Sequence, residues 1–209
     1  MKKLIFIKGF LTLVVGACLL LSMGCASPQP PELSAVYDRF VYLIENATDV
    51  NTVFFGEGLP VYSRDGAEAQ KQNMYYGAAD DGNEYVKPYA MFLNIDEIKA
   101  AAEQVYCDEY LESLYESLFT GYTAEELGTV LLPKYSEDEK SLYQNSTVTP
   151  LTSGAKVYDY ATMTILPDST ETTVRVEVEA YDESDADERF TLTLSFVYEN
   201  GDWYLNSPC

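Results

Sequence analysis

The chain has 209 residues, of which 13 are Lys or Arg, 34 are Asp or Glu and none is His, so its formal net charge is −21. A surface this acidic disfavours nucleic acid and anionic lipid headgroups as partners. Without imidazole, the chain lacks the usual base for a serine or cysteine nucleophile and the usual nitrogen ligand of zinc. Because 47% of the residues are apolar and 13% are aromatic, the composition predicts a folded domain and excludes a disordered one.

The first 25 residues have the parts of a secretory signal. Two lysines precede an apolar run, which ends at Gly24 before Cys25. This end resembles a bacterial lipoprotein signal. The resemblance implies that residues 1–24 are removed as a signal peptide and that Cys25 receives a diacylglyceryl group. Two alternatives are lipidation at Cys18 and an uncleaved membrane helix, for which the apolar run is short.

Removal of the signal would leave 185 residues (209 − 24), enough for one domain. Residues 25–32 then form a lipidated tether, and their prolines favour an extended spacer. Residues 33–209 form a single extracytoplasmic α+β domain. Its expected location is the outer face of the cell membrane, where the lipid on Cys25 anchors it.

Apolar residues recur at helical spacing from Leu33 to Ala47, which predicts a helix over about 33–48. Residues 51–88 are rich in glycine and irregular. A segment of this length rarely stays without structure in a compact domain, so we expect short strands or a packed excursion there.

Three capping patterns follow. Asn94 and Glu97 form a capping box for one helix, and Asp108 is expected to cap a second helix whose apolar stripe includes Leu111 and Leu118. Residues 123–126, Thr-Ala-Glu-Glu, predict a short helical turn.

After Pro133 the apolar period changes to two, which is typical of half-buried strands. The predicted strands cover residues 157–165, 174–180, 190–196 and 203–205. Asn200-Gly201 is a strong hairpin signal. Consecutive hairpins predict an antiparallel meander of about four strands.

Helices followed by an antiparallel sheet predict the α+β class, with the N-terminal helices packed on the C-terminal meander. This order, with the closing Tyr198-Glu199-Asn200-Gly201-Asp202-Trp203-Tyr204-Leu205, resembles the nuclear-transport-factor-2-like cone fold over residues 33–207. The resemblance implies a cone-like domain.

The middle of the chain resembles the DL-endopeptidase inhibitor family of Gram-positive cell envelopes. The similar parts are Phe54-Phe55-Gly56, Tyr85-Val86, residues 95–119, Tyr135 and Leu142-Tyr143. The resemblance implies a protein that blocks cell-wall peptidases, and an acidic surface would suit a cationic enzyme cleft. The alternative is that these aromatic residues are core.

Two acidic segments, 80–84 and 182–188, carry the oxygen ligands that calcium prefers, but the spacing of a calcium loop is not met and solvated turns are favoured. Tyr158, Tyr160 or Trp203 would line the pocket of a cone-fold enzyme, although aromatic core is the commoner role.

Cys107 and Cys209 are the cysteines that remain if Cys18 is cleaved off and Cys25 is lipidated. An exported compartment permits a disulfide between them, and a buried free Cys107 is the alternative that we favour.

We expect no catalytic, cofactor or metal site. The expected function is a non-catalytic, membrane-anchored cell-envelope lipoprotein that binds a protein or small ligand at the cell surface, such as a cell-wall hydrolase. The alternative is a cone-fold enzyme that uses carboxylates on a small molecule. An enzyme requires a deep pocket with a buried carboxylate, whereas a protein binder requires a shallow patch of exposed aromatic side chains.

Overall fold

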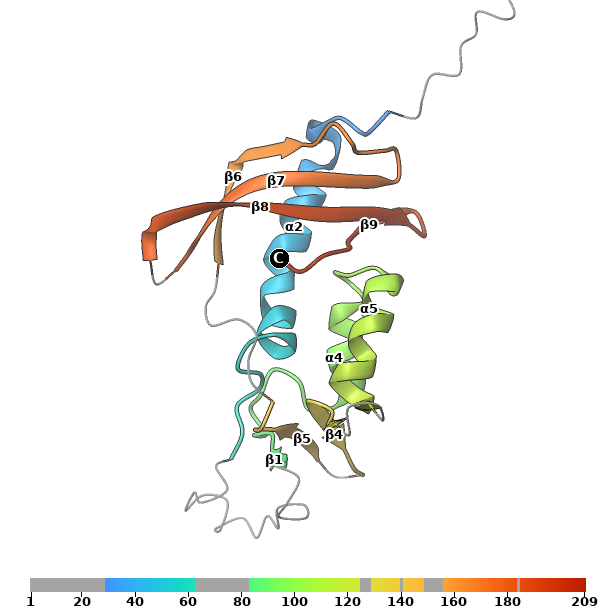
Figure 1. The fold of residues 1–209 in the computed structure, drawn as a ribbon, viewed down its shortest axis with the longest axis vertical. Helices are drawn as coiled ribbons and strands as arrows, with labels where there is room; N and C mark the ends of the chain where they lie inside the picture. The colour runs from blue at the N-terminus through green and yellow to red at the C-terminus, as the bar shows by residue number, and fades with distance from the viewer. Residues whose placement is uncertain (1–28, 63–82, 125–128, 140, 149–155, 184) are drawn as a thin grey trace, which may run out of the picture.

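The computed structural model describes residues 29–62, 83–124, 129–139, 141–148, 156–183 and 185–209. These ranges contain α-helices and antiparallel sheets, so the α+β class is confirmed (Figure 1). The predicted signal peptide 1–24 and the lipidation site Cys25 lie outside the described residues.

Helix α2 (Leu33–Phe54) starts at Leu33, as predicted, with Glu32 at its N-cap, but ends six residues (54 − 48) beyond the predicted boundary. The reason is that its apolar stripe continues at helical spacing through Val50, Val53 and Phe54, which are all buried. Burial of these side chains therefore extends the helix into residues 51–54. The sequence had suggested irregular structure there, because glycines follow closely.

Side chains from a distant strand terminate α2. The Lys134 ammonium donates to the carbonyl oxygens of Phe54 (3.3 Å) and Gly56 (2.8 Å), and the Tyr135 hydroxyl donates to the carbonyl of Val53 (2.9 Å). The last carbonyls of a helix have no partner within it, so these bonds supply what the helix end lacks. A cation at this end also interacts favourably with the helix dipole.

The larger sheet is the predicted meander. Its strands are β6 (Lys156–Ile165), β7 (Thr173–Asp182), β8 (Asp185–Glu199) and β9 (Asp202–Leu205), paired antiparallel in the order β6-β7-β8-β9. The β8–β9 turn has positive φ at both Asn200 (52°) and Gly201 (91°), as a two-residue hairpin turn of the primed type requires.

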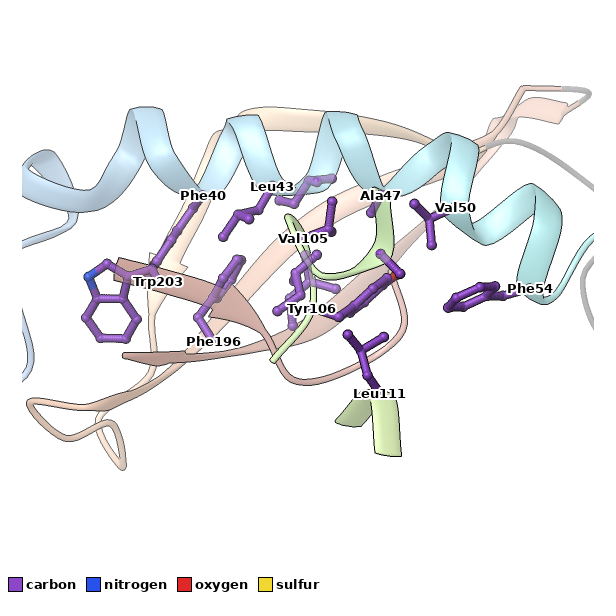
Figure 2. Close-up of a cluster of buried hydrophobic side chains, with 14 of the residues drawn as sticks. Phe40, Leu43, Ala47, Val50, Phe54, Val105, Tyr106, Leu111, Phe196 and Trp203 are labelled. Carbon is purple, nitrogen blue, oxygen red and sulfur yellow. The ribbon is translucent and has the colours of Figure 1, made fainter. Parts of the chain in front are cut away.

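Ring contacts join α2 to this sheet. Phe40 of α2 stacks on Phe196 of β8, with ring centroids 3.8 Å apart, and meets the edge of Trp203 of β9 at 5.5 Å. Figure 2 shows these side chains in one buried cluster with Val105, Tyr106 and Leu111. The core therefore lies between α2, the sheet and the segment that contains Val105 and Tyr106.

That segment also covers the outer edge of β9. The Cys107 amide donates to the Leu205 carbonyl (3.0 Å), and the Leu205 amide donates to the Val105 carbonyl (2.8 Å). Tyr106 and Leu205 form a parallel bridge. An open strand edge invites pairing with other chains, so this short extension protects the sheet on one side.

The predicted N-cap at Asn94 is confirmed, but the reciprocal bond of Glu97 goes to the Leu93 amide and not to that of Asn94, as a capping box requires. Helix α4 (Ile95–Ala102) starts after Asn94, whose Oδ1 accepts from the Glu97 amide (2.8 Å). The Glu97 carboxylate accepts in return from the Leu93 amide (2.7 Å).

The prediction that Asp108 caps the next helix is wrong. Helix α5 (Asp108–Tyr115) already contains Asp108, and Cys107 takes the capping position without a side-chain bond. The amide of Asp108 instead donates to Glu199 Oε1 (3.1 Å). Because residues 105–107 are held extended along β9, the helix begins as soon as that pairing ends. A π-helical turn, η1 (Glu116–Thr120), continues it.

Two small sheets complete the fold. One contains β1 (Asn83–Tyr85), β5 (Leu142–Asn145) and β4 (Tyr135–Glu137) in the order β1-β5-β4. The other pairs β2 (Tyr122–Ala124) with β3 (Thr129–Leu131).

The helical turn predicted over 123–126 is wrong for the part that is described. Thr123 lies in β2 opposite Val130 of β3. Glu125 and Glu126 lie outside the described residues.

Candidate functional site

The loop of residues 87–94, between β1 and α4, is fixed at both ends. Before it, the Val86 amide donates to the Leu142 carbonyl, and the Lys87 amide donates to the Pro60 carbonyl (2.9 and 2.8 Å). At its far end lies Asn94, the N-cap of α4, and the Leu93 amide donates to the Glu97 carboxylate. Hydrogen bonds on both sides of the loop therefore fix its two ends.

Side chains of this loop alternate between the core and solvent. Ala90 and Phe92 pack against the core, while Tyr89, Met91 and Leu93 are 72%, 56% and 49% exposed. Three large apolar side chains are therefore exposed within five residues. We call them, together with the half-exposed Tyr42 of α2, the apolar patch.

Beside the loop is a shallow hollow of about 210 Å³ between α2 and α4. It is lined by Tyr42, Asn46, Asp49, Val50, Met91, Phe92, Ala101, Gln104 and Val105. Tyr42 and Met91 belong to both features, so the patch and the hollow form one continuous surface. Pockets for small-molecule ligands usually measure about 300–1,000 Å³, so this hollow suits a single side chain better than a whole ligand.

The charge of the hollow is negative. Asp49 is the one charged residue among those that line it, and no lining residue is basic. Within the described part of the chain, Asp49 takes part in none of the ion pairs shorter than 4.0 Å. A net charge of −21 for the whole chain acts in the same direction.

No carboxylate is buried in the ranges that the structure describes. The buried polar or charged residues there are Lys134, Gln144, Asn145 and Ser169. Burial lowers the pKa of Lys134 to about 8, but its ammonium donates to the carbonyl oxygens of Phe54 and Gly56 at the end of α2. We assign Lys134 to the structure of the helix end.

The predicted pocket residues do not line the hollow. Trp203 is buried against Phe40, and Tyr158 stacks with Tyr160 at 6.1 Å between ring centroids. Both tyrosines pack against the core, which agrees with the favoured interpretation that these aromatic residues are structural.

The two acidic segments are described only in part. Residues 80–82 and Ser184 lie outside the described residues; Asp182 ends β7 and Asp185 begins β8. Among the residues that can be placed, no group of three or more Cys, Asp or Glu side chains is arranged to hold a metal ion.

Cys107 and Cys209 are both free thiols. Cys107 Sγ donates to Asn206 Oδ1 (3.1 Å), and Cys209 Sγ accepts from the Asn51 amide (3.3 Å). Burial raises the pKa of both thiols, which keeps them protonated and unreactive. The alternative of a disulfide between them is therefore wrong.

The sequence pattern did not identify the 87–94 loop. The signal that could have found it is Tyr89-Ala90-Met91-Phe92-Leu93, an apolar run immediately before the N-cap Asn94 and too short for a helix of its own. None of the described helices is both long and apolar enough to cross a membrane. No protein-family model matches this chain, and a search of curated proteins found no match either.

Proposed function

We propose that this chain is a non-catalytic cell-envelope lipoprotein that binds the basic surface of another protein through the apolar patch and the adjoining hollow. The observation that carries the proposal is the exposure of Tyr89, Met91 and Leu93 on a loop that is anchored at both ends. Exposed apolar side chains gathered in one place are typical of protein interfaces.

Rigidity of the loop strengthens the proposal. A segment that already has its bound conformation loses little conformational entropy when a partner docks. Ala90 and Phe92 pack against the core and alternate with Tyr89, Met91 and Leu93, which leaves these three side chains exposed. An interface is therefore prepared before the partner arrives.

Charge selects the partner. The acidic chain attracts a basic protein and repels an acidic one, which accelerates encounter more than it adds to affinity. A cell-wall hydrolase with a basic substrate cleft fits this requirement, and inhibition would follow if the patch covers that cleft. The absence of a buried carboxylate from the described residues offers no support for the alternative of a cone-fold enzyme.

The setting of this function is the outer face of the membrane, with a diacylglyceryl group on Cys25. Helix α2 begins eight residues later (33 − 25), so an extended tether reaches at most roughly 28 Å from the lipid. The contacts of Phe40 with Phe196 and Trp203 support a cone-like arrangement in which α2 closes the open side of the curved meander.

The test is a titration of a purified DL-endopeptidase with the chain. Calorimetry measures binding, and the rate at which the enzyme hydrolyses a cell-wall peptide measures inhibition. We expect saturable inhibition that weakens as salt is raised, because exposed charges are screened. The double variant Tyr89→Ser, Met91→Ser should weaken binding by about tenfold or more, which corresponds to at least about 1.4 kcal/mol.

The control is Leu132→Ser, which removes an exposed apolar side chain (44%) that is not part of the patch. It should bind like the wild type. A wild-type chain that neither binds nor inhibits contradicts the peptidase as partner, and equal losses in the double variant and the control contradict the patch as the binding site.

A further inference from the structure

The residues that line the hollow offer an unusual set of hydrogen-bonding groups. Asn46 Nδ2 donates to the Tyr42 carbonyl (2.7 Å), and Gln104 Nε2 donates to the Ala100 carbonyl (3.2 Å). A backbone carbonyl oxygen can only accept, so these bonds fix which end of each amide is the NH₂ group. The amide oxygens of Asn46 and Gln104 take part in neither of these two bonds.

Asp49 adds a carboxylate to those two amide oxygens. In the described ranges none of the three groups has its oxygen engaged by a donor, so the lining residues offer one carboxylate and two amide oxygens as acceptors, beside the second N–H of each amide. The remaining lining is apolar or aromatic and includes Tyr42, Phe92 and Val50. Acceptors on apolar walls match a side chain with a methylene stem and a head that only donates.

We propose that the hollow receives one arginine side chain from the partner. This rests on the proposed function and names the chemistry of its central contact. The planar guanidinium carries five donors and no acceptor, so it can bond to several oxygens that are spread around a rim. Lysine has three donors on a single nitrogen and fits such a rim less well. The volume of about 210 Å³ suits one such side chain.

Arginine is also the cation that uses aromatic surface best. Its guanidinium stacks on ring faces, and the aromatic residues Tyr42 and Phe92 both line the hollow. The chain already makes this contact internally, because the guanidinium carbon of Arg39 lies 5.2 Å from the Tyr42 ring centroid. Arginine is enriched among the residues that dominate interface energetics, where it sits in a pocket within surrounding apolar contacts.

The experiment uses N-acetyl-arginine amide and the isotopically labelled full-length chain in detergent micelles. Its control ligand is N-acetyl-citrulline amide, which has nearly the same shape but no charge and fewer donors. We expect saturable chemical-shift changes at the side-chain amides of Asn46 and Gln104 with the arginine compound. The citrulline compound should bind about tenfold more weakly, and the lysine compound should fall between them.

The variant Asp49→Asn should remove the preference for arginine over citrulline, because it removes the charge and leaves an exposed residue of the same shape. Equal shifts with both ligands in the wild type, shifts confined to another surface, or stronger binding of lysine each contradict the proposal. Because this experiment contains no peptidase, its failure is distinguishable from failure of the proposed function, which the Tyr89→Ser, Met91→Ser variant tests.

Discussion

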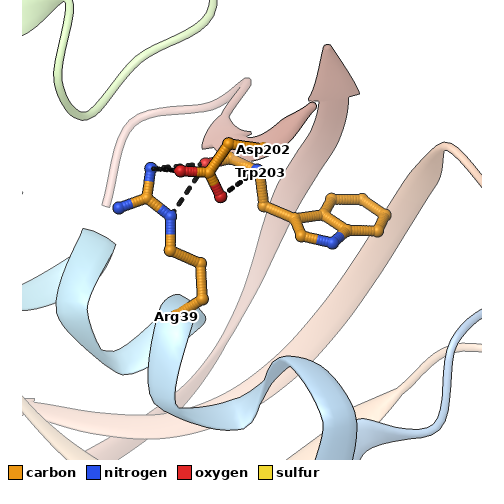
Figure 3. A network of polar contacts seen from close by, with 3 residues as sticks. All are labelled: Arg39, Asp202 and Trp203. Carbon is orange, nitrogen blue, oxygen red and sulfur yellow. Dashed lines mark hydrogen bonds and ion pairs between the residues drawn. The ribbon is translucent and has the colours of Figure 1, made fainter. Parts of the chain in front are cut away.

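Arg39 on α2 donates two hydrogen bonds to the backbone carbonyl of Trp203 on β9, from Nε (3.2 Å) and Nη2 (2.8 Å) (Figure 3). The same guanidinium forms an ion pair with Asp202 (3.1 Å) and lies over the rings of Tyr42 and Tyr204. One side chain therefore connects the first described helix to the last strand, 164 residues away in sequence. It also borders the apolar patch through Tyr42.

Comparing a variant of Arg39 with a variant of Asp202 should separate the effect of the hydrogen bonds from that of the ion pair. Arg39→Met removes two charge-assisted bonds to a carbonyl, and we expect a loss of about 1.5–3 kcal/mol in the free energy of unfolding. The measurement is a urea titration at neutral pH.

The matched control is Asp202→Asn, which keeps the Oδ1 acceptor of the Trp203 amide and the two Arg39 bonds but removes the charge. Because this pair is half-exposed, its loss should cost at most about 1 kcal/mol. A control that destabilises as much as Arg39→Met would mean that the ion pair, and not the carbonyl bonds, holds α2 to β9.

Two glycines with positive φ provide a second comparison. At Gly201 (φ 91°) an added Cβ meets nothing within 4 Å, so Gly201→Ala should cost only the strain of the backbone, about 1 kcal/mol. At Gly58 (φ 85°) the Cβ would lie 2.1 Å from Gln144 Oε1.

That oxygen accepts from the Leu59 amide, so Gly58→Ala must displace a buried hydrogen bond in addition to straining the backbone. We expect it to destabilise the protein by about 3 kcal/mol or more in thermal or urea unfolding. Similar losses at the two positions would refute the assignment of a close contact at Gly58.

The meander could be predicted from sequence because its signals are local. The alternation of Val174, Val176 and Val178 with polar residues fixes the buried face of β7, and Asn200-Gly201 fixes the turn. Each of these signals is contained within a few consecutive residues, so no knowledge of distant contacts was needed.

The helix ends and the candidate site depend on distant contacts and could not be predicted in the same way. Lys134 is buried because it meets the end of α2, 80 residues earlier in sequence, and nothing in its neighbours indicates this. Tyr89, Met91 and Leu93 have the composition of core residues. Only the packing of Ala90 and Phe92 on the opposite side decides that they face solvent.

The lowered pKa of Lys134 predicts how the free energy of unfolding changes above pH 8. Burial lowers its pKa from 10.5 to about 8, so between these values the unfolded chain binds more protons than the folded one. Stability from this group therefore rises with pH, by at most about 1.4 kcal/mol per pH unit. Wild-type stability should increase from pH 8 to about pH 9.5 relative to Lys134→Met.

The measurement is a series of urea titrations on both proteins across that range. The variant loses the bonds to Phe54 and Gly56, so its absolute stability will differ, but only the slope against pH tests the prediction. Parallel curves for the two proteins would show that Lys134 keeps its ordinary pKa.

Buried tyrosines predict the opposite trend at higher pH. Burial raises the pKa of Tyr110 and Tyr160 to about 12, and it raises the pKa of Tyr106 and Tyr135 further. When the pH exceeds 10.0, the ordinary pKa of tyrosine, the unfolded chain loses phenolic protons that the folded chain retains. By linkage the free energy of unfolding must then fall as pH rises.

The check is a pH titration that follows phenolate absorbance and far-ultraviolet circular dichroism together. The absorbance of the buried tyrosines should appear only with the loss of secondary structure. Tyr135→Phe should be less stable than the wild type at neutral pH by about 1 kcal/mol, because its hydroxyl no longer donates to Val53. This deficit should shrink above pH 10, because the variant has one fewer buried hydroxyl to keep protonated. If all phenols ionise together near pH 10 while the circular dichroism is unchanged, these side chains are not buried as the structure places them.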